Sequence, residues 1–198
     1  MSQMSVVIVH ELPPEELRFH WKSGRLCLDF VATVGERWRR SFERLLEPED
    51  LARWIAGTGM LQEPPRVSGR QLAAGRVLRE AINRLARPGA EPRPGDREEL
   101  NRWAARTPLA PQLTTGSERV WVAARPVEAM LATIARDAVD LLSGPLAARV
   151  RECAAPDCAL LFVDTSRPGR RQWCSSGACG NRIRTKAYRH RQKERGRG

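Results

Sequence analysis

The sequence contains no run of eighteen or more apolar residues, the length that a membrane-spanning helix requires. Its beginning also lacks the basic start and small-residue cleavage site of a secretory signal peptide. These absences argue against a membrane protein and lead us to expect a cytoplasmic one. Because thiols stay reduced in that compartment, the five cysteines favour metal binding over disulfide bonds.

Histidine is also scarce, and this bears on catalysis. The three histidines, His10, His20 and His190, fall in unrelated segments, and no Ser/His/Asp arrangement or glycine-rich phosphate loop is present. Cys27 lies in an apolar run and is typical of a small buried side chain. We therefore expect no enzyme activity.

What remains is the composition of a globular protein, with 41% hydrophobic and 29% charged residues. Apolar residues at helical spacing predict helices that begin at Pro48, Ser68 and Pro126. Asp96 with Glu99 is typical of a capping box that opens another helix.

The other elements predicted for the body are a strand over 17–21, a helix over 26–38 and a β-hairpin over 109–124. The apolar run 26–31 would also suit a buried strand, but its spacing favours the helix. No βαβ alternation is present. We expect an α+β fold, in which residues 1–148 form a mainly helical N-terminal body with a small β-hairpin. Residues 149–198 would form a separate C-terminal module.

Four of the five cysteines form two pairs, with four residues inside each pair and fifteen between the pairs. They are Cys153, Cys158, Cys174 and Cys179. Zinc prefers four soft ligands in a tetrahedron, and two such pairs on separate turns supply them. An iron–sulfur cluster is disfavoured, because its ligands usually include a two-residue spacing. Four cysteines leave no open coordination position, so we expect one structural Zn²⁺ that stabilises a module too small to fold by apolar burial alone.

The segments around the cysteines predict a knuckle, a hairpin and a helix. Residues 156–157, Pro-Asp, supply a turn inside the first pair. The runs 160–163 and 170–173 flank a polar loop and are predicted to pair as a β-hairpin over the metal. No proline follows the last cysteine, so we expect a helix over 180–195, with Ile183 and Ala187 facing the hairpin. This order is the plan of a treble-clef zinc finger.

Positive charge is concentrated at the C-terminal end. The formal net charge is +11, and from residue 151 onward there are twelve Lys and Arg against four Asp and Glu. The first 150 residues hold 22 basic and 19 acidic side chains. This distribution favours a polyanionic partner at the C-terminal end, although a merely solubilising end would have the same charge.

Several motifs overlap the cysteines: Leu-Phe-Val-Asp-x-Ser at 161–166, Arg-x-Trp-Cys-Ser at 171–175, Cys-Gly-Asn-Arg at 179–182 and Lys-Ala-Tyr-Arg at 186–189. Together they resemble the CGNR zinc finger. The run Gly-Arg-Leu-Cys-Leu-Asp-Phe-Val at 24–31 is similar to the opening motif of the ABATE domain, which accompanies this finger in bacterial stress-induced transcription regulators. That motif usually continues with Asn-Thr, where this chain has Ala32-Thr33. The resemblance implies a zinc-binding, DNA-binding regulator of transcription in which the four cysteines are the ligands.

A cationic helix that binds double-stranded DNA neutralises phosphates and reads base edges from rigid positions. Arg182 and Arg184 lie nearest the metal, so we expect them to make the specific contacts. The remaining candidates, which would contact phosphates or extend the same surface, are Arg170, Arg171, Lys186, Arg189, Arg191, Lys193 and Arg195.

Other readings stay open at this point. RNA is a rival partner, since Tyr188 and Trp173 offer stacking surfaces, although Trp173 is more typical of a core residue. A zinc-stabilised module that docks onto an acidic protein is another. The body could sense a small-molecule effector through Trp21, Asp29 and Arg37, although Asp29 equally suits a helix cap or a satisfied buried carboxylate. The apolar helix near residues 130–142 could support a homodimer, and core burial explains it as well.

Overall fold

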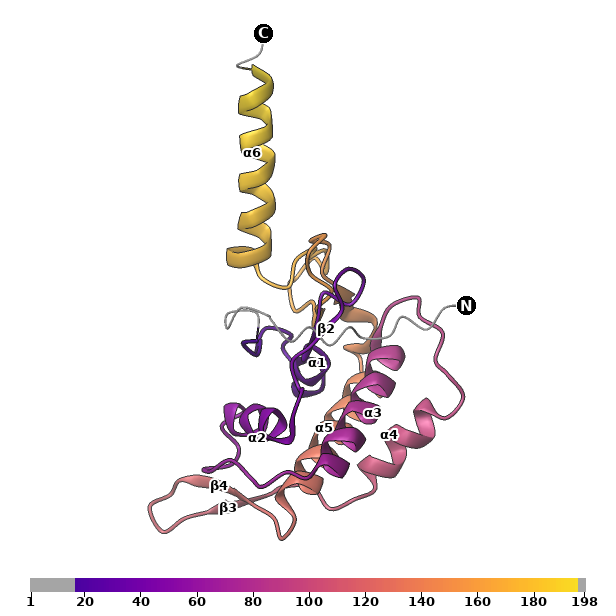
Figure 1. Cartoon of the computed structure of the whole chain (residues 1–198), viewed down its shortest axis with the longest axis vertical. Helices are drawn as coiled ribbons and strands as arrows, with labels where there is room; N and C mark the ends of the chain where they lie inside the picture. The colour runs from indigo at the N-terminus through magenta and orange to yellow at the C-terminus, as the bar shows by residue number, and fades with distance from the viewer. Residues whose placement is uncertain (1–16, 196–198) are drawn as a thin grey trace.

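The computed structural model describes residues 17–195, except for the side chains of His190, Arg191 and residues 193–195. Three helices pack against one another as the frame of the body (Figure 1). They are α3 (Gly69–Ala86), α4 (Asp96–Ala104) and α5 (Pro126–Ser143). Within residues 17–195, every helix is too short or too polar to cross a membrane.

The predicted helix starts at Pro48, Ser68 and Pro126 are confirmed. Helix α2 (Pro48–Gly57) begins with proline in its first turn, where the missing N–H group costs nothing. At α3, the Ser68 side chain accepts the Gln71 N–H and the Gln71 side chain accepts the Ser68 N–H. This reciprocal cap satisfies two backbone donors that the first helical turn leaves open.

The predicted capping box at Asp96 is wrong. The residue before α4 is Gly95, whose φ of 91° only glycine adopts easily. Asp96 is buried instead against Arg84, with its Oδ1 2.6 Å from a guanidinium nitrogen, and it also accepts the Arg93 N–H. A charged partner therefore outcompetes the local cap for this carboxylate.

The beginning of the described chain departs most from its prediction. Residues 17–21 form no strand, because every sheet in the described part has only two strands and none of them includes this segment. The helix predicted over 26–38 is too long, since α1 spans only Leu26–Val31. The apolar pattern behind the predicted helix instead serves the core, where Leu28, Phe30 and Val31 are buried.

After α1 the chain forms a short antiparallel pair of β1 (Val34–Gly35) with β2 (Phe42–Glu43). The loop between the two strands has Glu36 and Ser41 at φ values of 41° and 46°. Left-handed backbone at both residues is incompatible with a continuing helix. We call this unit, residues 34–43, the β1–β2 hairpin.

Gly35 is required by the packing of the β1–β2 hairpin. A Cβ atom at this position would lie 2.3 Å from the ring of Phe42, which is buried. We expect Gly35→Ala to lower the free energy of unfolding by about 1–3 kcal/mol, because the ring must move out of a packed site. Gly69→Ala is the matched control, since nothing lies near that position. Chemical denaturation of both variants measures the difference, and equal stabilities would contradict this packing.

A second hairpin is confirmed where the sequence predicted one. Strand β3 (Ala110–Leu113) pairs with β4 (Arg119–Val122) in antiparallel register. It extends from one side of the body (Figure 1). Helix α5 directs its apolar side chains into the core, where Met130, Leu131 and Ile134 are fully buried. Core packing therefore accounts for the apolar face of α5.

A third hairpin joins the body to the cysteine module. Strand β5 (Val150–Glu152) pairs with β6 (Leu161–Val163), so the predicted pairing of 160–163 with 170–173 is wrong. Successive side chains of β6 point to opposite faces. Leu161 and Val163 join the core of the body, whereas Phe162 packs beside the cysteines. This two-sided burial explains why β6 pairs with β5, which is apolar at Val150.

Candidate metal centre

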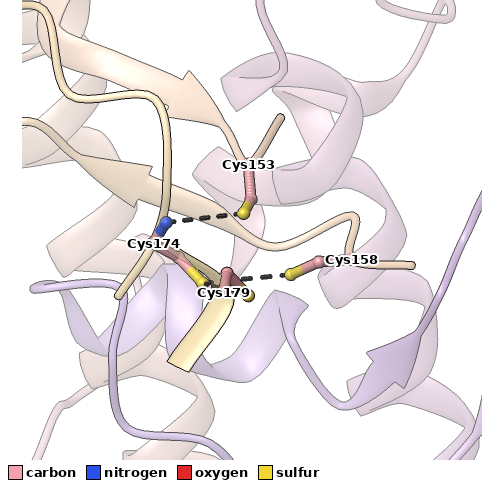
Figure 2. A group of neighbouring side chains, drawn as sticks. All are labelled: Cys153, Cys158, Cys174 and Cys179. Atoms are coloured by element: carbon pink, nitrogen blue, oxygen red, sulfur yellow. Dashed lines mark hydrogen bonds between the residues drawn. The ribbon is translucent and has the colours of Figure 1, made fainter. Parts of the chain in front are cut away.

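The four predicted ligands come together at the tip of the β5–β6 hairpin and in the loop before α6 (Asn181–Arg195). Their sulfur atoms all lie within 4.8 Å of one another. Figure 2 shows the side chains converging from separate segments. Cys158 Sγ lies 3.9 Å from Cys174 Sγ, which lies 3.7 Å from Cys179 Sγ. Among the described residues, this cluster consists of the four cysteines alone, with no histidine or carboxylate.

These separations fit zinc and not disulfides. A tetrahedron with Zn–S bonds of about 2.3 Å places its sulfurs about 3.8 Å apart. A disulfide needs about 2.05 Å, and all five cysteines of the chain are free. Cys153, Cys158, Cys174 and Cys179 would therefore hold one structural Zn²⁺, with no position left for substrate.

The electrostatics of the cluster also call for a cation. Hydrogen bonds from Cys158 and Cys174 lower the pKa of Cys153 to about 2, while the bond to Cys153 raises the pKa of Cys158 to about 12. The same contact with Cys153 raises the pKa of Cys174. Without a cation, ionisation of Cys153 therefore keeps its neighbours Cys158 and Cys174 protonated. A divalent cation at the centre allows all four to ionise together.

The first pair of cysteines is held by a turn that the sequence predicted. The Cys158 N–H donates to the Ala155 carbonyl at 3.0 Å, and the Cys153 N–H donates to the Leu160 carbonyl at 3.0 Å. Pro156 and Asp157 lie at the outside of this knuckle. The turn therefore directs both sulfurs to one side of the β5–β6 hairpin.

Asp164 and Arg171 hold the loop that returns to Cys174. Asp164 is fully buried and accepts hydrogen bonds from Ser166 and from the Arg171 N–H, which is 2.9 Å away. The Ser166 hydroxyl and these N–H groups lower the pKa of Asp164 to about 2. The Arg171 guanidinium donates to the carbonyls of Trp173 and Cys174 and lies over Phe162. Arg171, a predicted nucleic-acid contact, thus positions the metal loop.

Helix α6 is confirmed over the predicted segment and begins two residues after Cys179. A wide turn with π-helical hydrogen bonding, η2 (Ser176–Gly180), contains Cys179 and leads into α6, and Ser175 caps this turn by accepting the Ala178 N–H. Ile183 packs against the cysteine cluster, whereas Ala187 is exposed. Only the first turn of α6 therefore contacts the finger, and the rest projects from the end of the molecule (Figure 1).

Both arginines predicted to contact bases make contacts inside the finger. Arg182 lies 2.8 Å from the Asp157 carboxylate and 3.5 Å from Cys179 Sγ, and its side chain stays 52% exposed. Arg184 donates to the Ser176 carbonyl and lies over Trp173. Trp173 is half-buried against the cluster, which agrees with a core role.

The remaining predicted cations differ in their surroundings. Lys186 and Arg189 are exposed on α6, and Arg170 is exposed in the loop before Trp173. The structure gives these three described side chains no hydrogen bond or ion pair within the finger. The side chains of Arg191, Lys193 and Arg195 lie outside the described residues.

The three residues predicted to sense an effector are not brought together. Trp21 stacks on Trp54, with ring centroids 5.3 Å apart. Asp29 accepts hydrogen bonds from the Ser23 N–H and hydroxyl, which matches the satisfied carboxylate that the sequence also allowed. Arg37 is buried and pairs with Glu80 at 2.8 Å.

Arg37 belongs to a buried ionic network that the sequence did not reveal. Arg79, which is 2% exposed, binds both carboxylate oxygens of Glu43 at 2.7 Å. Arg79 also contacts Glu80 at 2.9 Å and the Thr33 hydroxyl at 3.1 Å. This network fastens the β1–β2 hairpin to α3.

The β1–β2 hairpin forms one wall of a pocket of about 290 Å³ whose other wall is the cysteine cluster. Sulfur-bearing residues Cys158, Cys174 and Cys179 line it, as do His20 and Arg44. Burial, followed by the charges of Arg44 and Lys22, lowers the pKa of His20 to about 4. The imidazole is therefore neutral at physiological pH, and body and finger meet across this pocket.

The geometry defines a four-cysteine zinc finger attached to a mainly helical body. Residues 149–192 match the CGNR zinc finger family. Residues 24–145 match the ABATE family, whose description is "Putative stress-induced transcription regulator". Since this match covers more than half of the chain, the protein belongs to the ABATE family. Neither family is described as enzymatic, and the comparison with curated proteins gave no match.

Ala32 marks where this chain departs from the ABATE opening motif. Its side chain is buried in the same cluster as Cys153, Phe162 and Cys179, and it lines the pocket. The Ala32 carbonyl accepts a hydrogen bond from Arg44 at 2.9 Å. The residue after α1 therefore lies at the contact between body and finger, a position that only the folded structure could reveal.

Proposed function

We propose that this protein is a transcription regulator that binds double-stranded DNA through α6 and the adjoining part of a treble-clef finger. The observation that carries the proposal is a helix that projects from the zinc site and is cationic along its length. Its fifteen residues hold seven Lys and Arg and one acid. At about 1.5 Å per residue the helix is about 22 Å long, enough to follow a groove or a phosphate backbone.

The cations of α6 include a stripe along one face. Arg182, Lys186 and Arg189 are separated by four and three residues, the spacing of one helical face. The same spacing continues in the sequence to Lys193. The outer members of this row, Lys186, Arg189 and Lys193, suit a line of phosphates. Arg182 and Arg184, which are fixed by contacts with the finger, suit base contacts.

The proposed role of the body, residues 1–148, is regulatory. Its core includes Val150, Leu161 and Val163 of the β5–β6 hairpin, and the Val163 N–H donates to the Ser23 carbonyl at 2.9 Å. Trp38 and Arg87 of the body both contact Glu152. A conformational change in the body would therefore be transmitted to the base of α6 through the packed contacts of the β5–β6 hairpin.

The test begins with selection of bound sequences from a random duplex pool, followed by affinity measurements over a range of salt concentrations. In Lys186→Ala/Arg189→Ala we expect weaker binding and a slope of log affinity against log salt that is smaller by about 2, because two phosphate contacts are lost. These side chains are exposed, so the variant should keep its zinc and its stability.

Arg70→Ala/Arg97→Ala is the matched control, since it removes two exposed arginines from the body. Its affinity and salt slope should equal those of the wild type. Tighter binding to single-stranded RNA than to any selected duplex would replace DNA with RNA as the partner. If the wild-type protein bound neither nucleic acid, the remaining function would be that of an interaction module that binds an acidic protein.

A further inference from the structure

The four cysteines differ in how far solvent reaches them. Cys153, Cys174 and Cys179 are 4–6% exposed, whereas Cys158 is only partly buried. Cys158 lies at the outer end of the knuckle, and it lines the pocket between the finger and the β1–β2 hairpin. Cys153 does not line that pocket. A small molecule in the pocket would therefore meet the sulfur of Cys158 first.

Hydrogen bonds also distinguish Cys158 from the other cysteines. The Cys153 sulfur, which does not line the pocket, accepts the Cys174 N–H at 3.5 Å. The Cys179 sulfur accepts a hydrogen bond from the Arg182 guanidinium at 3.5 Å. A charged donor withdraws electron density from the sulfur and lowers its nucleophilicity. Cys179 is thus both buried and deactivated, although it faces the same pocket.

We propose that Cys158 is a modification site, at which hydrogen peroxide or a similarly small peroxide oxidises the metal cluster. The Cys158 thiolate attacks one peroxide oxygen, an S–O bond forms, the O–O bond breaks, and the leaving hydroxide takes a proton to become water. The product is a sulfenic acid at Cys158. A pocket of about 290 Å³ admits a molecule of this size.

Cys174 completes the reaction. Its sulfur lies 3.9 Å from that of Cys158, so its thiolate can attack the sulfenic sulfur and release hydroxide, which again becomes water on taking a proton. Two thiolates are oxidised to one disulfide, and one peroxide is reduced to two waters. The sulfurs must close to about 2.05 Å, which requires a shift of the turn at Pro156, an exposed residue.

The disulfide removes two of the four ligands, and zinc bound by the other two would be lost. The loop that carries Cys174 and Cys179 would then no longer fix the first turn of α6. That last consequence rests on the proposed function, because it matters only if α6 binds nucleic acid. The oxidation itself does not depend on it.

The experiment uses the full chain loaded with zinc and treated with hydrogen peroxide. Released zinc is measured with a colorimetric chelator, and disulfides are mapped by alkylation, proteolysis and mass spectrometry. We expect one zinc released for each disulfide, with Cys158–Cys174 as the first bond. Cys27, which is fully buried in the body, is the internal control and should stay reduced. Zinc release with a first disulfide that lacks Cys158, or retention of zinc with all thiols intact, would overturn the proposal.

Two variants test whether Cys158 is the first sulfur to react. Cys158→His keeps a zinc ligand but removes the reactive sulfur, so we expect peroxide-driven zinc release to slow at least about tenfold, since attack must then begin at a buried sulfur. Cys153→His is the matched control, because it keeps Cys158 and should stay sensitive. Equal sensitivity of the two zinc-loaded variants would contradict the assignment. If either variant fails to hold zinc, the disulfide map of the wild type decides whether Cys158 reacts first.

Nucleic-acid binding is measured on the same samples. Oxidation without an effect on binding would count against the proposed function and not against the modification site.

Discussion

Cys174→Ser is expected to abolish stoichiometric zinc binding and to unfold the knuckle and the loop that leads from Cys174 to α6. Cys174 Sγ lies 3.9 Å from Cys158 Sγ and 3.7 Å from Cys179 Sγ, so its loss opens the cluster. Zinc contributes about 10–16 kcal/mol to the folding of zinc-finger peptides. Apolar burial around the cluster is confined to a few side chains, such as Leu160, Phe162 and Ile183, and cannot replace that contribution.

Native mass spectrometry would measure this loss, with one zinc per wild-type chain and none in the variant. Hydrogen exchange should show rapid exchange in the knuckle and in the loop from Cys174 to the base of α6, while amides of α3 and α5 stay protected by the main core. Cys27→Ala is the control, since it removes a cysteine from the body and should retain zinc. One tightly held zinc in the Cys174→Ser variant would mean that the cluster is not the metal site.

Glu43→Gln is expected to destabilise the body by about 3–5 kcal/mol, because it leaves the buried charge of Arg79 without its two-oxygen partner. For a chain of this size, a loss of about 3 kcal/mol corresponds to a fall in Tm of about 6–12 °C. Arg79 is 2% exposed and Glu43 is 5% exposed, so water cannot take the place of the lost carboxylate. Thermal unfolding by circular dichroism measures the effect.

Glu36→Gln provides the comparison. Glu36 pairs with Arg40, whose side chain is 43% exposed, and exposed pairs contribute about 0–1 kcal/mol. If Glu36→Gln lowered the Tm as much as Glu43→Gln does, burial of the Glu43–Arg79 ion pair would not be the cause of the lost stability. The double replacement Glu43→Leu/Arg79→Met should recover part of the stability, since it removes both buried charges together.

The same network predicts a response to acid. Burial alone would raise the pKa of Glu80, but the charges and hydrogen bonds of Arg37 and Arg79 lower it to about 2. A carboxylate whose pKa is lowered on folding adds stability above its unfolded pKa of about 4.5, and this stability is lost as the pH falls toward 2. Glu80→Gln should therefore differ most from the wild type near neutral pH and least near pH 2.

Local signals explain what the sequence predicted well. The caps of α2 and α3 depend on residues within a few positions of each other, such as Ser68 and Gln71. The metal ligands were also identifiable, because cysteine spacing reflects the turns that bring the sulfurs together. Helix α6 was identifiable from its uninterrupted polar sequence after the last cysteine.

The errors arose where partners are distant in the sequence. Strand β6 could pair with the segment before it or the segment after it, and the choice depends on burial of Leu161 and Val163 in the body core. The sequence also gave no sign of what Arg37 and Arg171 contact inside the protein. In the fold, Arg37 meets Glu80, 43 positions away, and Arg171 turns back onto the metal loop. Pairings of this kind cannot be deduced from composition or periodicity.

The position of α6 also affects the metal. Aligned peptide dipoles give a helix a partial positive charge at its N-terminal end. In this protein that end follows the last ligand, Cys179, by two residues, and four thiolates around Zn²⁺ carry a net charge of −2. The dipole therefore favours ionised sulfurs and should help the finger to retain its metal in mildly acidic solution. A helix that offers its side chains to a polyanion thus also stabilises, through its backbone, the anionic centre from which it extends.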